Sequence, residues 1–408
     1  MRVAVFLLLQ ILLALPASAA FTPPIPVSCP QLHEGIAYRI IPGKRPDLPT
    51  LVFFNGGPGE GSTLVSNAQV QRGIGTTGNI LVFDPRGTGC TPHSPRDDTS
   101  ALVNDVVALI TRLHRERRLH DFILFGHSYG SVPATRVAHA LETLHRSNPR
   151  SPLPTHLVLQ GAIGRAFTQP SERTDVLNQL LTRVQSQGPF ALGSGDAWGH
   201  FVGLSLIDDN PGASALTTAG QTPTSPVGTL RDSPSARLVS WLKRMGTPEF
   251  ERQFSRLGHA GNRAQPVTDS VRHRLACREL GLEPTRITLE GGRLREISLG
   301  ACGNTLRQEP YDARRYPLKT PIVYFLGGED ARTPRSQAEY HFGAQTGARR
   351  LLIEIPHAGH QPLTLGLWDC RAKVWEAVSQ SRLARVEALA ARCAPTLRSW
   401  YANASRDR

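Results

Sequence analysis

The sequence is poor in lysine, methionine and aromatic side chains. Aromatic residues make up 6% of its 408 positions, methionine occurs twice, and lysine occurs only at positions 44, 243, 319 and 373. Beyond the N-terminus, no apolar run approaches the roughly 20 residues that a membrane-spanning helix needs. The scarcity of aromatic residues argues against an all-β shell, and 40% hydrophobic against 19% charged residues argues against disorder. We therefore expect a globular protein without a transmembrane segment, long enough for one large domain with an insertion.

The N-terminus forms a pattern of its own. Arg2 supplies a positive charge, residues 3–15 are apolar with one exception, and the small-residue site A-S-A follows at 17–19. An apolar core this short, ended by small residues, is typical of a secretory signal peptide and not of a membrane span. We predict cleavage after Ala19 or one residue later, which leaves a periplasmic or secreted protein. A retained N-terminal anchor is the alternative.

Six cysteines fit the same export, because an exported chain with an even number of cysteines is expected to form disulfides. They are Cys29, Cys90, Cys277, Cys302, Cys370 and Cys393. Their spacing matches no zinc motif, so no metal site is predicted. Cys277–Cys302 is the best pair, since both lie in one segment and close a modest loop. Cys370 can reach Cys393 only if residues 379–381 break a helix that would otherwise hold the sulfurs roughly 35 Å apart.

The net charge of +13 comes almost entirely from arginine. A basic chain could bind nucleic acid or another acidic partner. The arginines are scattered, however, and the densest run, at 115–118, lies at the end of an amphipathic helical pattern. A solvated helix face explains this run better than a binding patch does. We predict no nucleic-acid partner.

Strands and helices alternate along most of the chain. Helical patterns at 102–119 and 132–144 separate buried strands, which are predicted at 50–54, 79–83, 122–125, 156–159, 321–326 and 351–355. This alternation indicates an α/β fold with a mostly parallel sheet and helices on both faces. The middle third has weak periodicity, and 207–236 is rich in proline, serine, threonine and glycine, as loops or flaps are. We predict a core at 20–165 and 316–408 that is split by an inserted cap at 166–315.

A nucleophile motif stands at 126–130, where G-H-S-Y-G matches G-x-S-x-G. A predicted strand precedes it and a predicted helix follows it, which is the context that this motif requires. The turn would present the hydroxyl of Ser128 at the carboxyl end of the sheet, over a helix N-terminus that favours developing negative charge. An ordinary turn is the alternative, because the pentapeptide is common by chance.

A serine nucleophile needs a base, and the base needs an orienting acid. In this topology they should follow along the chain in the order serine, acid, histidine. Asp330 comes after the strand at 321–326, and His357 and His360 come after the strand at 351–355. Both loops should open on the same edge of the sheet as Ser128, although acids and histidines are also common in surface loops.

Taken together, these motifs resemble the α/β-hydrolase serine peptidases related to prolyl iminopeptidase. The resemblance rests also on N-G-G-P-G at 55–59 and D-P-R-G-T-G at 84–89. The signal peptide and the cysteines make the secreted, tripeptidyl-aminopeptidase-like branch the most similar. The resemblance implies Ser128 as nucleophile, Asp330 as acid and His360 as base, because the family's histidine follows a glycine. It also implies an oxyanion hole formed by the backbone amides of Gly57 and Tyr129.

The sequence departs from this family in two places. The first loop usually begins with histidine, where this chain has Asn55; the oxyanion donor is a backbone amide, so the chemistry need not change. In prolyl iminopeptidases, glutamates of the cap bind the substrate's ammonium group, but these glutamates cannot be assigned to individual residues of this sequence. Candidate acids in the predicted cap are Glu249, Glu251 and Glu279.

Several functions stay open. The leading one is an exported serine aminopeptidase acting on peptides; an esterase or lipase with the same triad, or a non-catalytic binding protein, are the alternatives. Epoxide hydrolases and dehalogenases are disfavoured because they use aspartate where Ser128 stands. G-x-G-x-x-G at 73–78 precedes a strand instead of a helix, so no dinucleotide site is predicted. Two histidines at 357 and 360 lack the further ligands of a metal site. We predict no cofactor.

Overall fold

The structure is a computed structural model that describes residues 29–405, apart from positions 31, 34, 95–96, 168–170, 188–270, 272–273, 283–284, 291–292, 299 and 301. The predicted signal peptide, the loop at 207–236 and the candidate acids Glu249 and Glu251 therefore lie outside the described residues. In the part of the chain that is described, no helix has both the length and the hydropathy needed to cross a bilayer.

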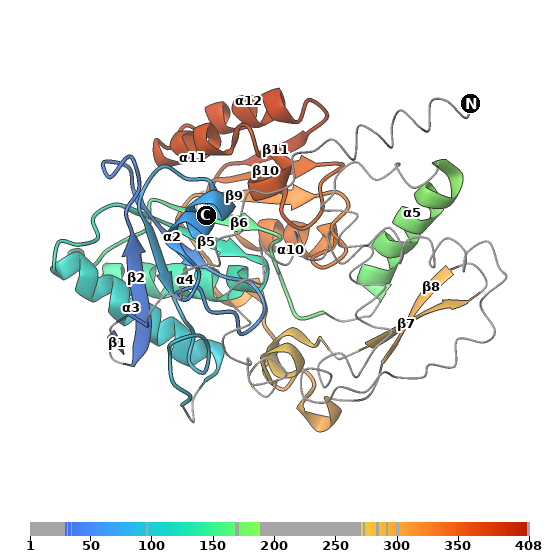
Figure 1. Ribbon diagram of the computed structural model, residues 1–408, viewed down its shortest axis with the longest axis horizontal. Helices are drawn as coiled ribbons and strands as arrows, with labels where there is room; N and C mark the ends of the chain where they lie inside the picture. The colour runs from blue at the N-terminus through green and yellow to red at the C-terminus, as the bar shows by residue number, and fades with distance from the viewer. Residues whose placement is uncertain are drawn as a thin grey trace, which may run out of the picture.

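The core is a nine-stranded sheet with the order β1-β2-β4-β3-β5-β6-β9-β10-β11 (Figure 1). Its strands are β1 (Leu32–His33), β2 (Ile36–Ile41), β3 (Thr50–Phe54), β4 (Ile80–Phe83), β5 (Phe122–His127), β6 (His156–Gln160), β9 (Ile322–Gly327), β10 (Arg350–Ile355) and β11 (Arg398–Ala402). Strands β4, β3, β5, β6, β9 and β10, which are neighbours in this order, run parallel to one another. Strands β1, β2 and β11 pair antiparallel with their neighbours at the two sides of the sheet. The predicted α/β class with a mostly parallel sheet is confirmed.

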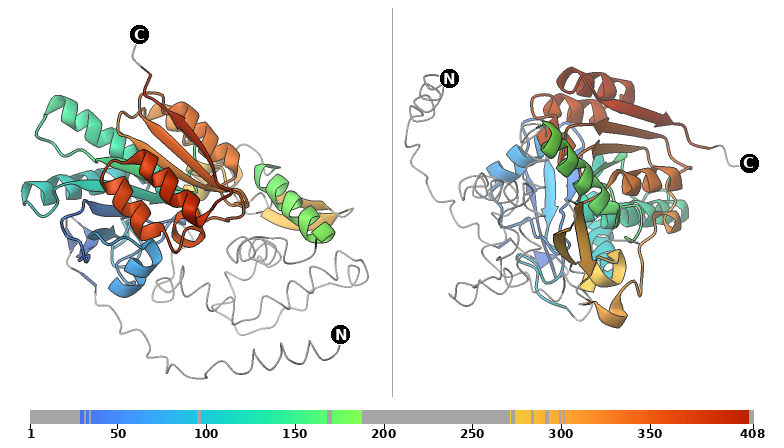
Figure 2. Two further views of the ribbon diagram at one scale, coloured as in Figure 1. Left: turned by 90° about the horizontal axis from the view of Figure 1, so that it is seen from above. Right: turned by 90° about the vertical axis from the view of Figure 1, so that its right-hand side faces the viewer.

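Helices cover both faces of the sheet because successive side chains of a strand point to opposite faces. In β5, Phe122 and Leu124 belong to one apolar cluster, and Ile123 and Phe125 to the other. Helices α3 (Thr99–Arg115), α4 (Ser131–Ser147) and α10 (Arg335–Ala344) pack in the first cluster. Helices α2 (Asn67–Ile74), α11 (Arg371–Ser379) and α12 (Leu383–Cys393) pack in the second (Figure 2).

The helix predicted at 102–119 extends from Thr99 to Arg115, so it begins and ends a few residues earlier than predicted. Its apolar positions, from Leu102 to Leu113, are buried as expected. The side chain of Asp98 accepts a hydrogen bond from the amide of Ala101 at 2.8 Å, so α3 begins at Thr99. An N-cap of this kind satisfies one of the amides that the first turn leaves without an intrahelical partner.

The segment between β6 and β9 leaves the sheet and returns to it beside the point where it left. The amide of Phe167 donates to the carbonyl of Leu280 at 2.7 Å, and that of Ala166 donates to the carbonyl of Tyr311 at 2.8 Å. Its described elements are α5 (Ser171–Gln187), the hairpin of β7 (Thr285–Glu290) and β8 (Arg293–Ser298), and three short helical turns, η3 (Ala276–Leu280), η4 (Gly303–Thr305) and η5 (Ala313–Arg315). Helix α5 packs against β8, and both lie beside the sheet, not on its faces (Figure 1).

Three disulfides join the six cysteines. The predicted pair Cys277–Cys302 is confirmed, with Cα atoms 5.5 Å apart. Cys370 also pairs with Cys393, because α11 ends at Ser379 and α12 starts only at Leu383, so the two helices form the hairpin that this pairing requires. The third disulfide joins Cys29 to Cys90.

A buried histidine makes stability depend on pH. His156, at the start of β6, is 1% exposed, and neither ring nitrogen has a hydrogen-bond partner among the described residues. Burial, aided by the charge of Arg349, lowers the pKa of His156 from 6.5 to about 4. Below pH 6.5 His156 therefore binds a proton in the unfolded chain but stays neutral in the folded chain. The free energy of unfolding consequently decreases as the pH falls toward 4.

We expect His156→Phe to remove this part of the acid sensitivity. Between pH 6.5 and pH 4.5 the wild type should lose roughly 2–3 kcal/mol more unfolding free energy than the variant, at about 1.4 kcal/mol per pH unit. Urea unfolding of both proteins at the two pH values measures the difference. Equal losses would show that His156 is protonated in the folded state.

Candidate active site

Ser128 lies in a strained turn at the carboxyl end of β5. Its φ is +54°, a value that side-chain-bearing residues rarely adopt. The turn continues as a single 3-10 turn (Ser128–Gly130) directly into α4. A Cβ atom on Gly126 would lie 2.7 Å from the Cα of Ser131, and one on Gly130 would overlap the carbonyl oxygen of Phe54. Glycine is thus required at both outer positions of the motif, as expected for a nucleophile turn.

Asp330 and His360 form a buried hydrogen-bonded pair. They follow β9 and β10, which are parallel neighbours in the sheet, and are 1% and 2% exposed. Nδ1 of His360 lies 2.8 Å from Oδ2 of Asp330. The amides of Arg332 and Thr333 donate to Oδ1 at 2.9 and 3.0 Å, and the Thr333 hydroxyl donates to Oδ2 at 2.6 Å. Since a carboxylate only accepts, the proton of the imidazole sits on Nδ1, and Nε2 carries the lone pair that a base needs.

His357 takes no part in this pair. Its side chain is 57% exposed, and its Nδ1 lies 3.4 Å from Oε1 of Glu329, the residue before Asp330. The same carboxylate oxygen forms an ion pair with Arg183 of α5. Of the two histidines after β10, it is His360 that contacts Asp330.

His127 joins the nucleophile turn to the histidine loop. Its ring centroid lies 4.9 Å from that of His360. Its Nδ1 is 3.1 Å from Nε2 of Gln160, whose Oε1 accepts from the amides of Leu363 and Thr364 at 2.9 and 3.0 Å. Burial, followed by the charge of a protonated His360, lowers the pKa of His127 to about 3. A neutral ring therefore lies beside the candidate base at neutral pH.

The loop after β3 lies against the nucleophile turn. A Cβ atom on Gly56 would come within 3.3 Å of the Cβ of Ser128. The next residue, Gly57, has a φ of +115° and is exposed. Tyr129, the other predicted oxyanion donor, directly follows Ser128 and is buried. The structure thus brings the 55–59 loop beside Ser128.

One contact near Tyr129 could not be predicted from sequence spacing. Glu279 accepts from the amide of Thr99 at 3.1 Å and from the Thr99 hydroxyl, and that hydroxyl lies 2.6 Å from the hydroxyl of Tyr129. Burial raises the pKa of Glu279, while the hydrogen bonds from Thr99 and the charge of Arg136 oppose the rise. Thr99 and Glu279 are separated by 180 residues along the chain. Their contact nevertheless puts one candidate cap acid two hydrogen bonds from the residue after Ser128.

The G-x-G-x-x-G run at 73–78 lies at the end of a helix. Gly75, within the G-x-G-x-x-G run, caps the C-terminus of α2 with a φ of +78°. Phosphate binding by that run would need a helix N-terminus instead. Among the described residues, no group of three or more His, Cys, Asp or Glu side chains could hold a metal ion.

Comparison with known proteins gives one family. No curated protein matches the sequence. Similar solved structures include a proline iminopeptidase from Mycobacterium smegmatis, with 13% identity over 86% of this chain and 96% of that one and a TM-score of 0.43. They also include an esterase from Thermogutta terrifontis, with 16% identity over 87% and 93% and a TM-score of 0.40. An alpha/beta hydrolase from a Medee basin deep-sea metagenome library has 15% identity over 86% and 94% and a TM-score of 0.41. Residues 51–377 match the sequence profile of the alpha/beta hydrolase family, so the chain belongs to that family.

Proposed function

We propose that the protein is a serine hydrolase in which Ser128 is the nucleophile, His360 the base and Asp330 the orienting acid. The observation that carries this proposal is the buried Asp330–His360 pair, in which Nδ1 of His360 lies 2.8 Å from Oδ2 of Asp330. This pair lies at the carboxyl ends of the strands, as does Ser128 in its strained turn. The pair has the tautomer that leaves Nε2 of His360 able to take a proton.

The chemistry that follows is acyl transfer. The Ser128 hydroxyl attacks the substrate's carbonyl carbon while His360 takes its proton, and the carbonyl oxygen becomes an oxyanion. The amides of Gly57 and Tyr129 donate to that oxyanion. As the bond to the leaving group breaks, His360 gives the proton to it, and an ester on Ser128 remains. Water then attacks this acyl-enzyme, His360 again takes and returns a proton, and Ser128 is released.

The substrate class that we propose is a peptide with a free N-terminus. This rests on the motif resemblance, including the loops at 55–59 and 84–89, and on Glu279. An aminopeptidase must pair the substrate's ammonium group, because a buried cation without a partner is costly. We propose that residues 166–315 form a cap over Ser128 and that an acid of this cap binds the ammonium group. Glu279, which the Thr99 hydroxyl links to the Tyr129 hydroxyl, is the described candidate.

Blocking the N-terminus tests this substrate class. We expect N-acetylation of a short peptide anilide to lower kcat/KM roughly 100-fold or more, which corresponds to several kcal/mol of activation free energy. The reason is that acetylation removes the cation and leaves a carboxylate of the site unpaired. The measurement compares kcat/KM for free and acetylated forms of one peptide, beside a panel of short acyl esters. Equal values for the two peptides would eliminate the aminopeptidase, and high ester turnover would identify an esterase instead.

We also propose export, with cleavage after Ala19 or one residue later. The three disulfides support it, because such bonds persist in oxidising compartments. The mature chain should then begin at Ala20 or Phe21. N-terminal sequencing and intact mass check this, and a mature chain that retains Met1 would contradict it.

A further inference from the structure

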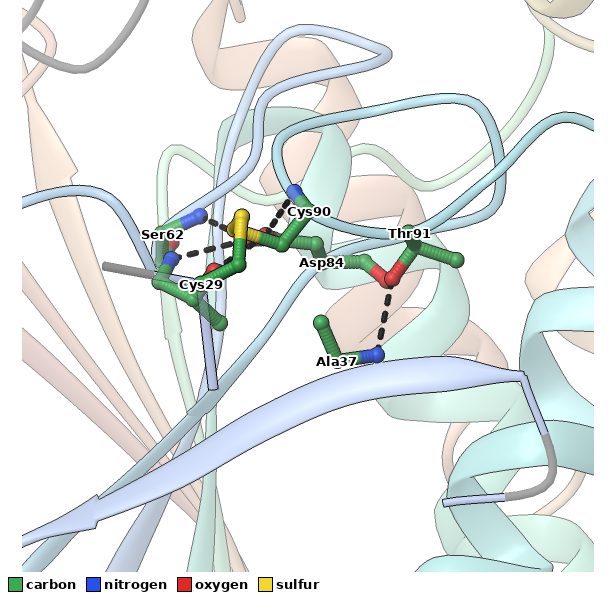
Figure 3. Close-up of a disulfide and its surroundings, with 7 residues drawn as sticks. Cys29, Ala37, Ser62, Asp84, Cys90 and Thr91 are labelled. Carbon is green, nitrogen blue, oxygen red and sulfur yellow. Dashed lines mark hydrogen bonds between the residues drawn. A yellow bond between two sulfur atoms is a disulfide. The ribbon is translucent and has the colours of Figure 1, made fainter. Parts of the chain in front are cut away.

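A buried carboxylate outside the triad holds the loop that carries Gly57. Asp84 follows β4 and is 0% exposed. Its Oδ1 accepts from the amides of Ser62 and Thr63 at 2.6 and 2.8 Å, and its Oδ2 accepts from the amide of Cys90 at 2.7 Å and from the Thr63 hydroxyl (Figure 3). Several charge-assisted hydrogen bonds to one buried carboxylate make a strong and directional anchor.

Asp84 is itself fixed to the sheet edge. The hydroxyl of Thr91 donates to the carbonyl of Asp84 at 2.8 Å and accepts from the amide of Ala37 in β2 at 2.8 Å (Figure 3). Cys90, whose amide bonds the carboxylate, is covalently joined to Cys29. The anchor therefore has little freedom to move with the loop that it holds.

The other end of the loop is held by Asn55, one of the two places where the sequence departs from the peptidases that it resembles. Its Oδ1 accepts from the amide of Gly56 at 2.8 Å, and its Nδ2 donates to the carbonyl of Gly61 at 3.4 Å. Gly61 directly precedes Ser62, which Asp84 holds. Hydrogen bonds thus fix the loop 55–63 at both ends, and Gly56 lies against Ser128 between them.

We propose that Asn55 and Asp84 are positioning residues that hold the Gly57 amide where the oxyanion forms. This inference rests on the proposed serine-hydrolase function. Neither side chain contacts the Asp330–His360 pair in the hydrogen bonds described. Loss of either should therefore weaken an interaction that is made mainly in the transition state, which lowers kcat and leaves KM nearly unchanged.

The test uses the mature, disulfide-bonded protein and whichever peptide anilide or acyl ester the wild type hydrolyses best. Asn55→Ala should lower kcat about 10- to 100-fold with KM within about threefold, since complete loss of one oxyanion donor costs about 100- to 1000-fold. The affinity of a substrate-like aldehyde or trifluoromethyl ketone should fall by the same factor as kcat/KM. Asn79→Ala is the matched control: Asn79 is also half-buried and accepts from a glycine amide, that of Gly43 at 2.9 Å, but it lies at the amino end of β4, whereas Asn55 lies at the carboxyl end of β3. Its kcat should stay within about twofold.

Asp84→Asn is a second variant with a larger expected loss of kcat, because its amide would direct N–H groups at backbone donors. Thermal unfolding and circular dichroism report whether Asp84→Asn folds. If Asp84→Asn does not fold, the proposal is tested by Asn55→Ala alone. The inference is overturned if Asn55→Ala loses no more kcat than Asn79→Ala, or if it raises KM alone. Failure of the proposed function looks different, because Ser128→Ala would then keep its activity.

Discussion

Replacing Ser128 by alanine is expected to lower kcat about a millionfold, leaving only the rate that binding and the oxyanion hole supply. Alanine keeps the Cβ of serine and so leaves the strain of the turn unchanged, and it removes a single oxygen, so the fold of the variant should be intact. Steady-state kinetics on the best substrate measure the loss. Ser147→Ala is the control, because Ser147 lies at the far end of α4, where its hydroxyl bonds only the carbonyl of Leu144 in the contacts described.

The size of the loss decides between nucleophiles. A fall of less than about 100-fold for Ser128→Ala would place the nucleophile elsewhere, because removal of an attacking group cannot be so mild. An unchanged rate in the control would show that loss of a serine hydroxyl from α4 does not by itself disturb the enzyme.

Asp330→Asn should lower kcat about 10⁴-fold through the wrong tautomer of His360. The amides of Arg332 and Thr333 donate to Oδ1, so the oxygen of an asparagine would stay on that side. Its NH₂ group would then face Nδ1 of His360 and move the imidazole proton to Nε2, where the base needs a lone pair. Steady-state kinetics should show a large loss of kcat and little change of KM.

The neighbouring carboxylate provides the control for this variant. Glu329 lies on the same loop, but it pairs with Arg183 and His357 and not with His360. The kcat of Glu329→Gln should therefore fall less than about tenfold, since this substitution leaves the tautomer of His360 unchanged. If Glu329→Gln lost as much as Asp330→Asn, the two acids would not have the separate roles that the geometry indicates.

The parts of the fold that recur along the chain could be predicted from the sequence. Buried strands each followed by a helix identify the parallel sheet, and loops after parallel neighbours must open on one edge, which is why Asp330 and His360 meet. The hairpin of α11 and α12 is not predicted by the sequence, which gives a break near 379–381 only as the condition for Cys370 to reach Cys393; the structure meets this condition. The antiparallel strands β1, β2 and β11 are not predicted by the sequence, since no helix pairs with them in a repeating pattern.

Contacts between distant residues could not be predicted. Glu279 meets Thr99 across 180 positions, and nothing in the local pattern of either residue indicates the other. Gln160 is likewise an unremarkable strand-end residue in the sequence, yet its side chain links the helical turn η6 (Pro362–Gly366) to His127. Such polar side chains depend on tertiary placement, whereas motifs depend on local turns and strands.

Covalent labelling with an organophosphonate tests the central claim most directly, because the reaction needs both an activated serine and its base. Peptide mass spectrometry of the labelled protein should find the adduct on Ser128. Labelling should be nearly abolished in His360→Ala and kept in His357→Ala, the exposed neighbour. An adduct on another residue, or labelling that survives in His360→Ala and is lost in His357→Ala, would contradict the assignment of Ser128 and His360 as nucleophile and base.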